Sequence, residues 1–195
     1  MTTLDELETA LHAAWALGDA EKAGEIGAQI DALPQPPAVS VLSAALWYAQ
    51  QGLHVFALSP NSKIPHKGTR GCKDATSDEP TIRAWWDRWP DSNVGIATGH
   101  LVDVVDIDGA TGQQSRAQNW PMFAGLTVIG TVLTPRPGGM HLYVPANPAV
   151  GNGAGLLPNV DYRGNGGYVV APPSRTEQGS YRWLRPLLVG SEVKA

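Results

Sequence analysis

Carboxylate side chains gather in one apolar stretch of the sequence. The segment DVVDIDG (103–109) places three aspartates among valine and isoleucine. In a β-strand, residues i and i+2 point to the same face with their Cα atoms about 6.6–7 Å apart, so Asp106 and Asp108 project together. Val105 and Ile107 point to the other face, toward a core. The acid-bearing face must therefore be wet or bound to a metal.

Two carboxylates that face each other in a dry site repel, and the pKa of one of them rises. A hard divalent cation with oxygen ligands relieves this repulsion, so the pair predicts a metal site. Acids that cap a turn before Gly109 are the structural alternative. Asp103 lies on the opposite face by strand parity, and we expect it to have a cap or loop role.

A histidine follows two glycines in the segment GGMHLYV (138–144). Strand alternation places His141 and Tyr143 on one face and Met140 and Leu142 on the other. Two glycines allow a close approach of the backbone to a ligand. A single histidine in a strand is compatible with a structural role, but opposite a carboxylate pair it favours contact with phosphate.

A third acid lies in the segment NVDYRGNGGYVVAPPS (159–174), where Asp161 and Arg163 share a strand face and GNGG forms a hairpin turn. This pair predicts a third metal ligand with an arginine that orients it or touches phosphate. A turn with a surface ion pair is the alternative. Lys63 lies on a loop after the first predicted strand and by itself is compatible with an ordinary surface lysine.

Charge divides the chain into two unequal parts. Residues 1–40 carry seven acidic residues and one lysine, a net charge of −6, whereas residues 41–195 carry 13 basic and 11 acidic residues, a net charge of +2. The overall charge of −4 argues against a simple nucleic-acid binder. A basic cluster is compatible with a solvated loop or with phosphate contacts, and consists of Lys63, Lys67, Arg70 and Lys73.

Several classes of protein are excluded by composition. The single cysteine, Cys72, excludes an internal disulfide and a cysteine-based zinc finger. No stretch approaches 18 uninterrupted apolar residues, so no membrane span is expected. The acidic, amphipathic N-terminus is unlike a signal peptide, which predicts a cytoplasmic protein.

Helical spacing of apolar residues predicts a small hairpin of two helices over residues 1–33, with Asp19 as the cap of the second. PQPP (34–37) reads as a linker, so we expect an acidic hairpin and linker over 1–37 and a main domain over 38–190. Helices are predicted over about 38–51, over EPTIRAWWDRW with Ser77 as its cap, and over about 110–119. Strands are predicted over 53–60, 93–99, 101–108, 126–134, 138–145, 159–164, 166–174 and 180–184.

This mixture of elements predicts an α+β fold with a mostly antiparallel sheet. Together, the segments resemble the bifunctional DNA primase/polymerase (prim-pol) domain of the archaeo-eukaryotic primase superfamily, which is typical of phage and plasmid replication proteins. The resemblance covers roughly residues 40–185. The segments that carry it are ALWYAQQGLHVFALSPNSKIP, GCKDATSDEPTIRAWWDRWPDSNVGIATG, VVDIDG, GGMHLYV, NVDYRGNGGYVVAPPS and YRW.

The resemblance implies an RRM-like catalytic sheet joined to an N-terminal α/β unit, with the hairpin outside it. It implies that Asp106, Asp108 and Asp161 are catalytic and hold Mg²⁺ or Mn²⁺. It implies a nucleotide-binding role for four further residues, namely His141, Arg163, Lys63 and Ser174. The histidine motif is preceded by TPRPGG where the family commonly has Ser-Gly-Gly, so Arg136 and Pro137 are expected to alter this loop.

The implied activity is that of a nucleotidyltransferase, a DNA primase or DNA polymerase that joins NTPs or dNTPs on a single-stranded DNA template. A separate replicative helicase is an expected partner, and a phage-encoded chain is expected in the host cytoplasm. Two other readings stay open at the level of sequence. The same acids could serve a metal-dependent nuclease or nucleotide hydrolase, or the domain could be a non-catalytic module that binds a replication origin.

Overall fold

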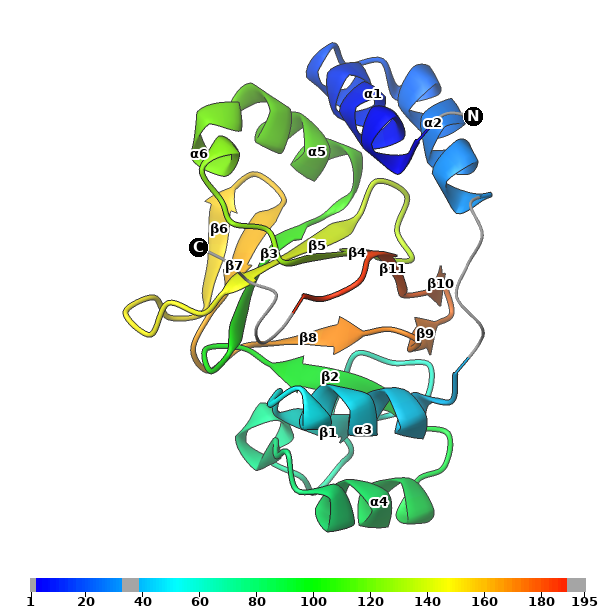
Figure 1. Ribbon diagram of the computed structural model, residues 1–195, viewed down its shortest axis with the longest axis vertical. Coiled ribbons are helices and arrows are strands. Elements are labelled where there is room, and N and C mark those ends of the chain that lie inside the picture. The colour runs from blue at the N-terminus through cyan, green and yellow to red at the C-terminus, as the bar shows by residue number, and fades with distance from the viewer. Residues whose placement is uncertain (1–2, 33–38, 189–195) are drawn as a thin grey trace.

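The computed structural model describes residues 3–32 and 39–188, so the predicted PQPP linker lies outside the described residues. Helices and strands are interspersed up to residue 124, and the regular elements of the described residues after it are all strands (Figure 1). The helices are α1 (Leu4–Ala16), α2 (Ala20–Asp31), α3 (Val41–Gln50), α4 (Glu79–Arg88), α5 (Gly109–Gln118) and α6 (Trp120–Ala124), with a 3-10 turn η1 (Gly71–Asp74).

The larger sheet has six strands in the order β11-β4-β5-β3-β7-β6, and every neighbouring pair is antiparallel. Its strands are β3 (Val102–Ile107), β4 (Gly130–Leu133), β5 (Met140–Pro145), β6 (Gly153–Leu157), β7 (Val160–Arg163) and β11 (Arg182–Arg185). The central order β4-β5-β3-β7, with α5 directly after β3, agrees with the RRM-like sheet that the resemblance implies, but β6 rather than a helix lies between β5 and β7. The predicted α+β class is therefore confirmed.

A second antiparallel sheet has the order β1-β2-β8, with β1 (Val55–Leu58), β2 (Asn93–Ala97) and β8 (Tyr168–Ala171). The N-terminal α/β unit thus needs a strand from the C-terminal half, because β8 pairs with β2 along its whole length. A two-stranded ribbon of β9 (Arg175–Thr176) and β10 (Gly179–Ser180) follows.

Each face of the six-stranded sheet contributes to a different core. Val105 and Ile107 pack with Phe123 of α6 in one cluster. Gly112 lets α5 approach this face closely, because a Cβ there would lie 3.0 Å from Cγ2 of Ile107. On the opposite face, Val104 and other strand residues pack in the main core, which the larger sheet shares with the three-stranded sheet.

The N-terminal hairpin packs on the rest of the molecule rather than standing apart. Its buried residues form a cluster with Leu133 of β4 and Leu184 of β11. Arg185 of β11 forms ion pairs with Asp5 and Glu8 of α1. Figure 1 shows α1 and α2 above the larger sheet, beside α5.

Local capping rules explain most helix starts and correct one of our predictions. Asp19 caps α2 as predicted, since its side chain accepts the backbone N–H of Lys22 at 2.9 Å. Ser77 is not the cap of α4, so that prediction was wrong. Asp78 takes this position and accepts from the backbone N–H of Thr81 at 2.9 Å. Strand β6 and helix α6 had not been predicted.

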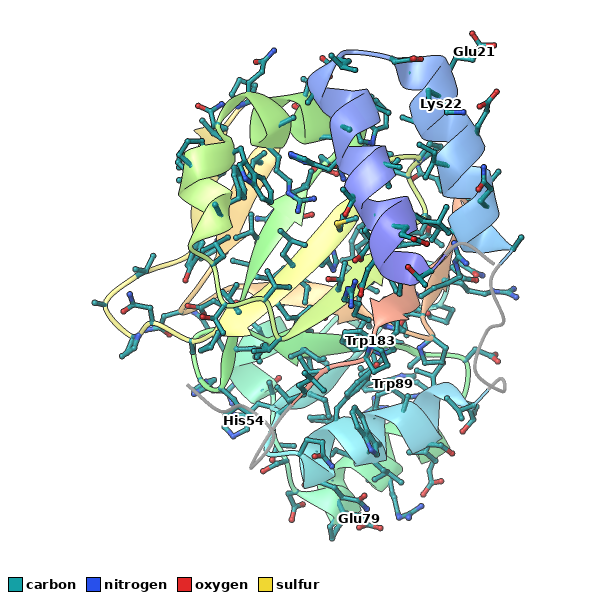
Figure 2. All side chains as sticks on the ribbon, turned by 45° about the horizontal axis from the view of Figure 1, so that its top comes forward. Glu21, Lys22, His54, Glu79, Trp89 and Trp183 are labelled. Atoms are coloured by element: carbon teal, nitrogen blue, oxygen red, sulfur yellow. The ribbon has the colours of Figure 1, made fainter. Side chains whose placement is uncertain are left out.

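A buried tyrosine joins the two sheets. The Tyr48 hydroxyl of α3 donates to the Pro172 carbonyl at 2.6 Å and accepts from the indole N–H of Trp183 at 3.0 Å. Figure 2 labels Trp183 in the interior, above α3. The hydroxyl of Tyr143 is also buried, yet it has no hydrogen-bond partner among the described residues.

These two hydroxyls give a matched test of the interior. We expect Tyr48→Phe to lower the free energy of unfolding by about 1–3 kcal/mol, because it leaves a buried carbonyl and a partly buried indole N–H without partners. Tyr143→Phe should be neutral or slightly stabilising. Urea unfolding of the two variants measures the difference, and equal losses of stability would contradict the assigned hydrogen bonds.

Candidate active site

Three polar side chains lie in one row across the centre of the larger sheet. Asp106 of β3 is directly opposite His141 of β5 on one side and Asp161 of β7 on the other. Opposed residues in antiparallel strands share a face, so segments far apart in the sequence bring these groups together. The register of two strand pairs therefore builds the site.

Like charges directly opposite each other destabilise a sheet, and Arg163 relieves this strain. Its Nη2 atom lies 3.2 Å from Oδ2 of Asp106 and 2.6 Å from Oδ2 of Asp161. The other oxygen of Asp161 accepts the backbone N–H of Gly155 at 2.7 Å. In this conformation the guanidinium group fills the position between the two carboxylates where a cation would be expected.

Asp108 lies just beyond β3, at the first turn of α5, and its side chain makes no capping hydrogen bond. Its Oδ1 atom lies 3.3 Å from Nη1 of Arg136, in the loop between β4 and β5. The side chain of Asp108 is 37% exposed and that of Asp106 is 15% exposed. Both line the same pocket, as the strand pattern predicted.

This pocket has a volume of about 290 Å³ and lies where the two sheets meet. Its lining combines residues of β3, β5, β7 and β8 with residues of the β7–β8 turn and of neighbouring loops: Lys63, Asp106, Asp108, His141, Asn152, Arg163, Gly166, Gly167, Tyr168, Val169, Val170 and Tyr181. Tyr168 donates to the Lys63 carbonyl at 3.0 Å, which holds the loop after β1 at the rim. The geometry thus brings Lys63 to the carboxylate pair.

Glycine is required in the turn that forms one wall of the pocket. A Cβ at Gly167 would lie 2.4 Å from Oδ1 of Asn152 and 2.9 Å from Oγ1 of Thr98. No side chain fits between these groups without displacing them. The close approach of the turn to β2 therefore depends on the GNGG sequence.

His141 is buried beside Asp106, with its Nε2 atom 3.5 Å from Oδ1. Burial lowers the pKa of His141, and the negative charge of Asp106 only partly opposes this. The ring is therefore neutral near pH 7. Its Nδ1 atom has no hydrogen-bond partner among the described residues, which leaves one ring nitrogen uncommitted.

The donor set fits a hard divalent cation in part. Two carboxylates that line one open pocket are the ligands that Mg²⁺ and Mn²⁺ prefer. Within the described ranges, however, no group of three His, Cys, Asp or Glu side chains is placed to hold one ion. Asp161 does not line the pocket, and its carboxylate is engaged by Arg163 and Gly155. Asp106 and Asp108 line the pocket but pair with Arg163 and Arg136, so a guanidinium group must move before either carboxylate can hold a cation.

The sequence was compared with known proteins. The Prim-Pol family, described as bifunctional DNA primase/polymerase, N-terminal, matches residues 45–193. The chain belongs to the Prim-Pol family. No curated protein matches the sequence at a significant level. Membership supports a primase/polymerase role in DNA replication, with nucleotides and a DNA template as the molecules that are bound.

The Prim-Pol match begins at residue 45, after the N-terminal hairpin and within α3. It includes every residue that lines the carboxylate pocket. Over the part of the chain that the structure describes, none of the helices has the length and apolar character needed to cross a bilayer.

One residue with an expected nucleotide-binding role lies outside the pocket. Ser174 is fully buried, and its hydroxyl accepts the backbone N–H of Val94 at 2.9 Å and contacts the carbonyl of the same residue at 3.3 Å. It does not line the carboxylate pocket. In this structure the Ser174 hydroxyl joins the end of β8 to β2, which is a structural role.

Sequence reasoning missed two partners of the site. Arg136 had been noted only as part of an unusual loop, whereas the structure pairs it with Asp108. Tyr181 closes the pocket beside His141, with ring centroids 5.7 Å apart. The departure of TPRPGG from the family sequence was a signal for Arg136, but no local pattern pointed to Tyr181. Asp103 lies away from the pocket, where its Oδ2 atom accepts from Asn147 N–H at 2.8 Å.

Measurements of the free energy of unfolding test whether Arg163 takes the place of a cation between the carboxylates. We expect Arg163→Met to lower the free energy of unfolding at pH 7 by about 1–2 kcal/mol, because it leaves two partly buried carboxylates facing each other. Mg²⁺ should then raise the Tm of the variant more than that of the unmodified chain. Thermal unfolding with and without MgCl₂ measures both effects.

Arg83→Met is the matched control, since Arg83 pairs with Glu79 on the exposed surface of α4. It removes the same charge away from the pocket and should change neither quantity by more than a few tenths of a kcal/mol. An Arg163→Met variant with unchanged stability and no additional gain from Mg²⁺ would contradict the assignment.

Proposed function

We propose that this protein is a DNA-dependent primase/polymerase that adds ribo- or deoxyribonucleotides on a single-stranded DNA template by two-metal nucleotidyl transfer, in phage or plasmid replication. The observation that carries the proposal is the row of Asp161, Asp106 and His141 across three strands, of which Asp106 and His141 line one pocket with Asp108. Catalysis is assigned to residues 38–190. A cytoplasmic location and a separate replicative helicase as partner are parts of the same proposal.

The carboxylates provide the negative charge that would hold the divalent cations of the reaction. Mg²⁺ or Mn²⁺, when bound, would supply positive charge at the attacking 3′-oxygen and at the leaving pyrophosphate. Asp106 and Asp108 would hold the cation, and Asp161 would join them once Arg163 leaves its carboxylate. The sheet keeps these side chains in fixed positions, so little reorganisation is needed during the reaction.

The cationic and imidazole groups orient the triphosphate. His141 lines the pocket beside Asp106 and is assigned to the triphosphate. Lys63 reaches the rim from the loop after β1, and Arg163, once released, turns from carboxylate to phosphate. Positioning of the nucleotide against the primer end accounts for the rate enhancement, because the protein forms no covalent bond with the substrate.

An incorporation assay tests the proposal directly. We expect labelled NTPs or dNTPs to be joined on a single-stranded template when Mg²⁺ or Mn²⁺ is present. The Asp106→Asn/Asp108→Asn double variant should lose at least about 10²-fold of this activity. Its Tm should stay within a few degrees of the unmodified value, since the side-chain shape is kept. Incorporation at the unmodified rate would overturn the site assignment.

The same assay separates the two alternative functions. Cleavage of the template or hydrolysis of nucleotides without extension would indicate a nuclease or nucleotide hydrolase that uses the same acids. Template binding with neither reaction would indicate an origin-binding module.

Template binding should depend on salt through the basic loop. The four basic side chains of this loop are exposed, although Arg70 pairs with Asp74 at 2.7 Å. Each phosphate contact contributes about −0.7 to the slope of log K against log [salt] for single strands. We therefore expect Lys67→Ala/Lys73→Ala to reduce the steepness of this slope by about 1.4.

Lys22→Ala is the control for this titration. Lys22 is half exposed, pairs with Glu25 and lies on the outer side of α2 (Figure 2). Its removal deletes a lysine from the acidic hairpin and should leave the slope unchanged. An affinity that does not vary with salt would rule out phosphate contacts as the basis of template binding.

A further inference from the structure

The N-terminal hairpin reaches the loop that carries Arg136. Trp15 of α1 is buried, and a Cβ at Gly138 would lie 3.2 Å from its Cζ2 atom. Residues 134–139 of this loop line a cavity of about 490 Å³ together with residues of α1 and α2. Figure 1 shows the loop between β4 and β5 lying beneath the hairpin. The contact joins a segment outside the Prim-Pol match to a loop inside it.

Gly138 is wedged between the hairpin and the start of α5. On its other side, the same Cβ would lie 3.2 Å from the carbonyl carbon of Gly109 and 3.3 Å from the nitrogen of Ala110. Its backbone has φ of 75°, and its carbonyl accepts from Nε2 of Gln113 at 2.9 Å. The loop is therefore held from two sides, by Trp15 and by α5.

Arg136 uses this placement to reach the catalytic pocket. Its side chain passes over Gly109, where a Cβ would lie 3.0 Å from Cδ of Arg136. The guanidinium then pairs with Asp108, and the arginine side chain is 50% exposed. A continuous series of contacts thus runs from Trp15 through Gly138 to the arginine on Asp108.

The charged residues of the hairpin support a fixed docking on the body. Arg185 of β11 donates from Nε to Oε2 of Glu8 at 2.8 Å and also pairs with Asp5. These carboxylates raise the pKa of Arg185. Glu21 and Lys22 instead point away from the body on α2 (Figure 2). The side of the hairpin that faces the loop is thus the packed side.

We propose that the hairpin is a positioning element of the active site, and that Trp15 is a positioning residue that acts through Gly138 to keep Arg136 on Asp108 in the nucleotide-free protein. This inference rests on the proposed function, in which the pocket binds a divalent cation and a nucleotide. A guanidinium on Asp108 competes with a divalent cation for the same carboxylate. A triphosphate offers Arg136 a second anionic partner, so the cation and the nucleotide bind best together.

Opposite changes in two affinities distinguish this role from simple loss of structure. Arg136→Ala should tighten the binding of Mn²⁺ alone by about two- to fivefold, the value of an exposed ion pair. The same variant should weaken the binding of dATP in the presence of Mn²⁺ by a similar factor. A damaged site would bind both ligands more weakly.

Trp15→Ala should shift both affinities in the same directions as Arg136→Ala. Because Trp15 acts through Arg136, adding Trp15→Ala to Arg136→Ala should cause no further change. Trp15→Phe should restore values near those of the unmodified chain. Isothermal titration with Mn²⁺ alone, and with dATP at saturating Mn²⁺, measures all four variants on the full chain.

Leu7→Ala is the control, since Leu7 is buried in the same hairpin but does not line the cavity beside the loop. It should leave both affinities unchanged. Gly138→Ala, which places a methyl group between Trp15 and Gly109, provides a second route to the same shift if Trp15→Ala does not fold.

The proposal is overturned if Arg136→Ala leaves Mn²⁺ affinity unchanged, if the effects of Trp15→Ala and Arg136→Ala add, or if Leu7→Ala reproduces them. Binding of Mn²⁺ alone requires no catalysis. A chain that fails to incorporate nucleotides but shows the expected cycle would therefore disprove the proposed function and support the role of the hairpin.

Discussion

The antiparallel pairing of β3 with both β5 and β7 places Asp106 directly opposite His141 and Asp161. This register brings together an imidazole and two carboxylates, and it also creates an electrostatic problem, since like charges across a sheet repel. Arg163, two residues after Asp161 on the same strand, lies within 3.2 Å of both carboxylates. The site is therefore assembled and neutralised by the same three strands.

Arginine side chains form ion pairs with the carboxylates of the site on two sides. Arg163 bridges Asp106 and Asp161, and Arg136 pairs with Asp108. In the proposed function, an entering cation displaces a guanidinium group, and the triphosphate gives that group a new partner. Under the same proposal, this exchange couples binding of the cation to binding of the nucleotide.

The two sheets form different walls of the pocket. The six-stranded sheet carries the acids, whereas β8 and the β7–β8 turn of the other sheet form the facing wall of the pocket. Tyr48 joins them by bonding to Pro172 after β8 and to Trp183 of β11. The hairpin, which precedes the family match, adds a contact through Trp15 to the loop that carries Arg136.

Local chemistry determined which residues could form the site. Alternation placed Asp106 with Asp108 and His141 with Tyr143, turn and cap residues marked most elements, and the α+β class followed from their mixture. Tertiary structure decided the rest: β8 joins β1 and β2, the Ser174 hydroxyl bonds to Val94, and Arg136 reaches Asp108. Periodicity within a segment reports only which face a side chain takes. The partner that it meets there depends on strand pairing and packing between residues tens of positions apart, which no local pattern encodes.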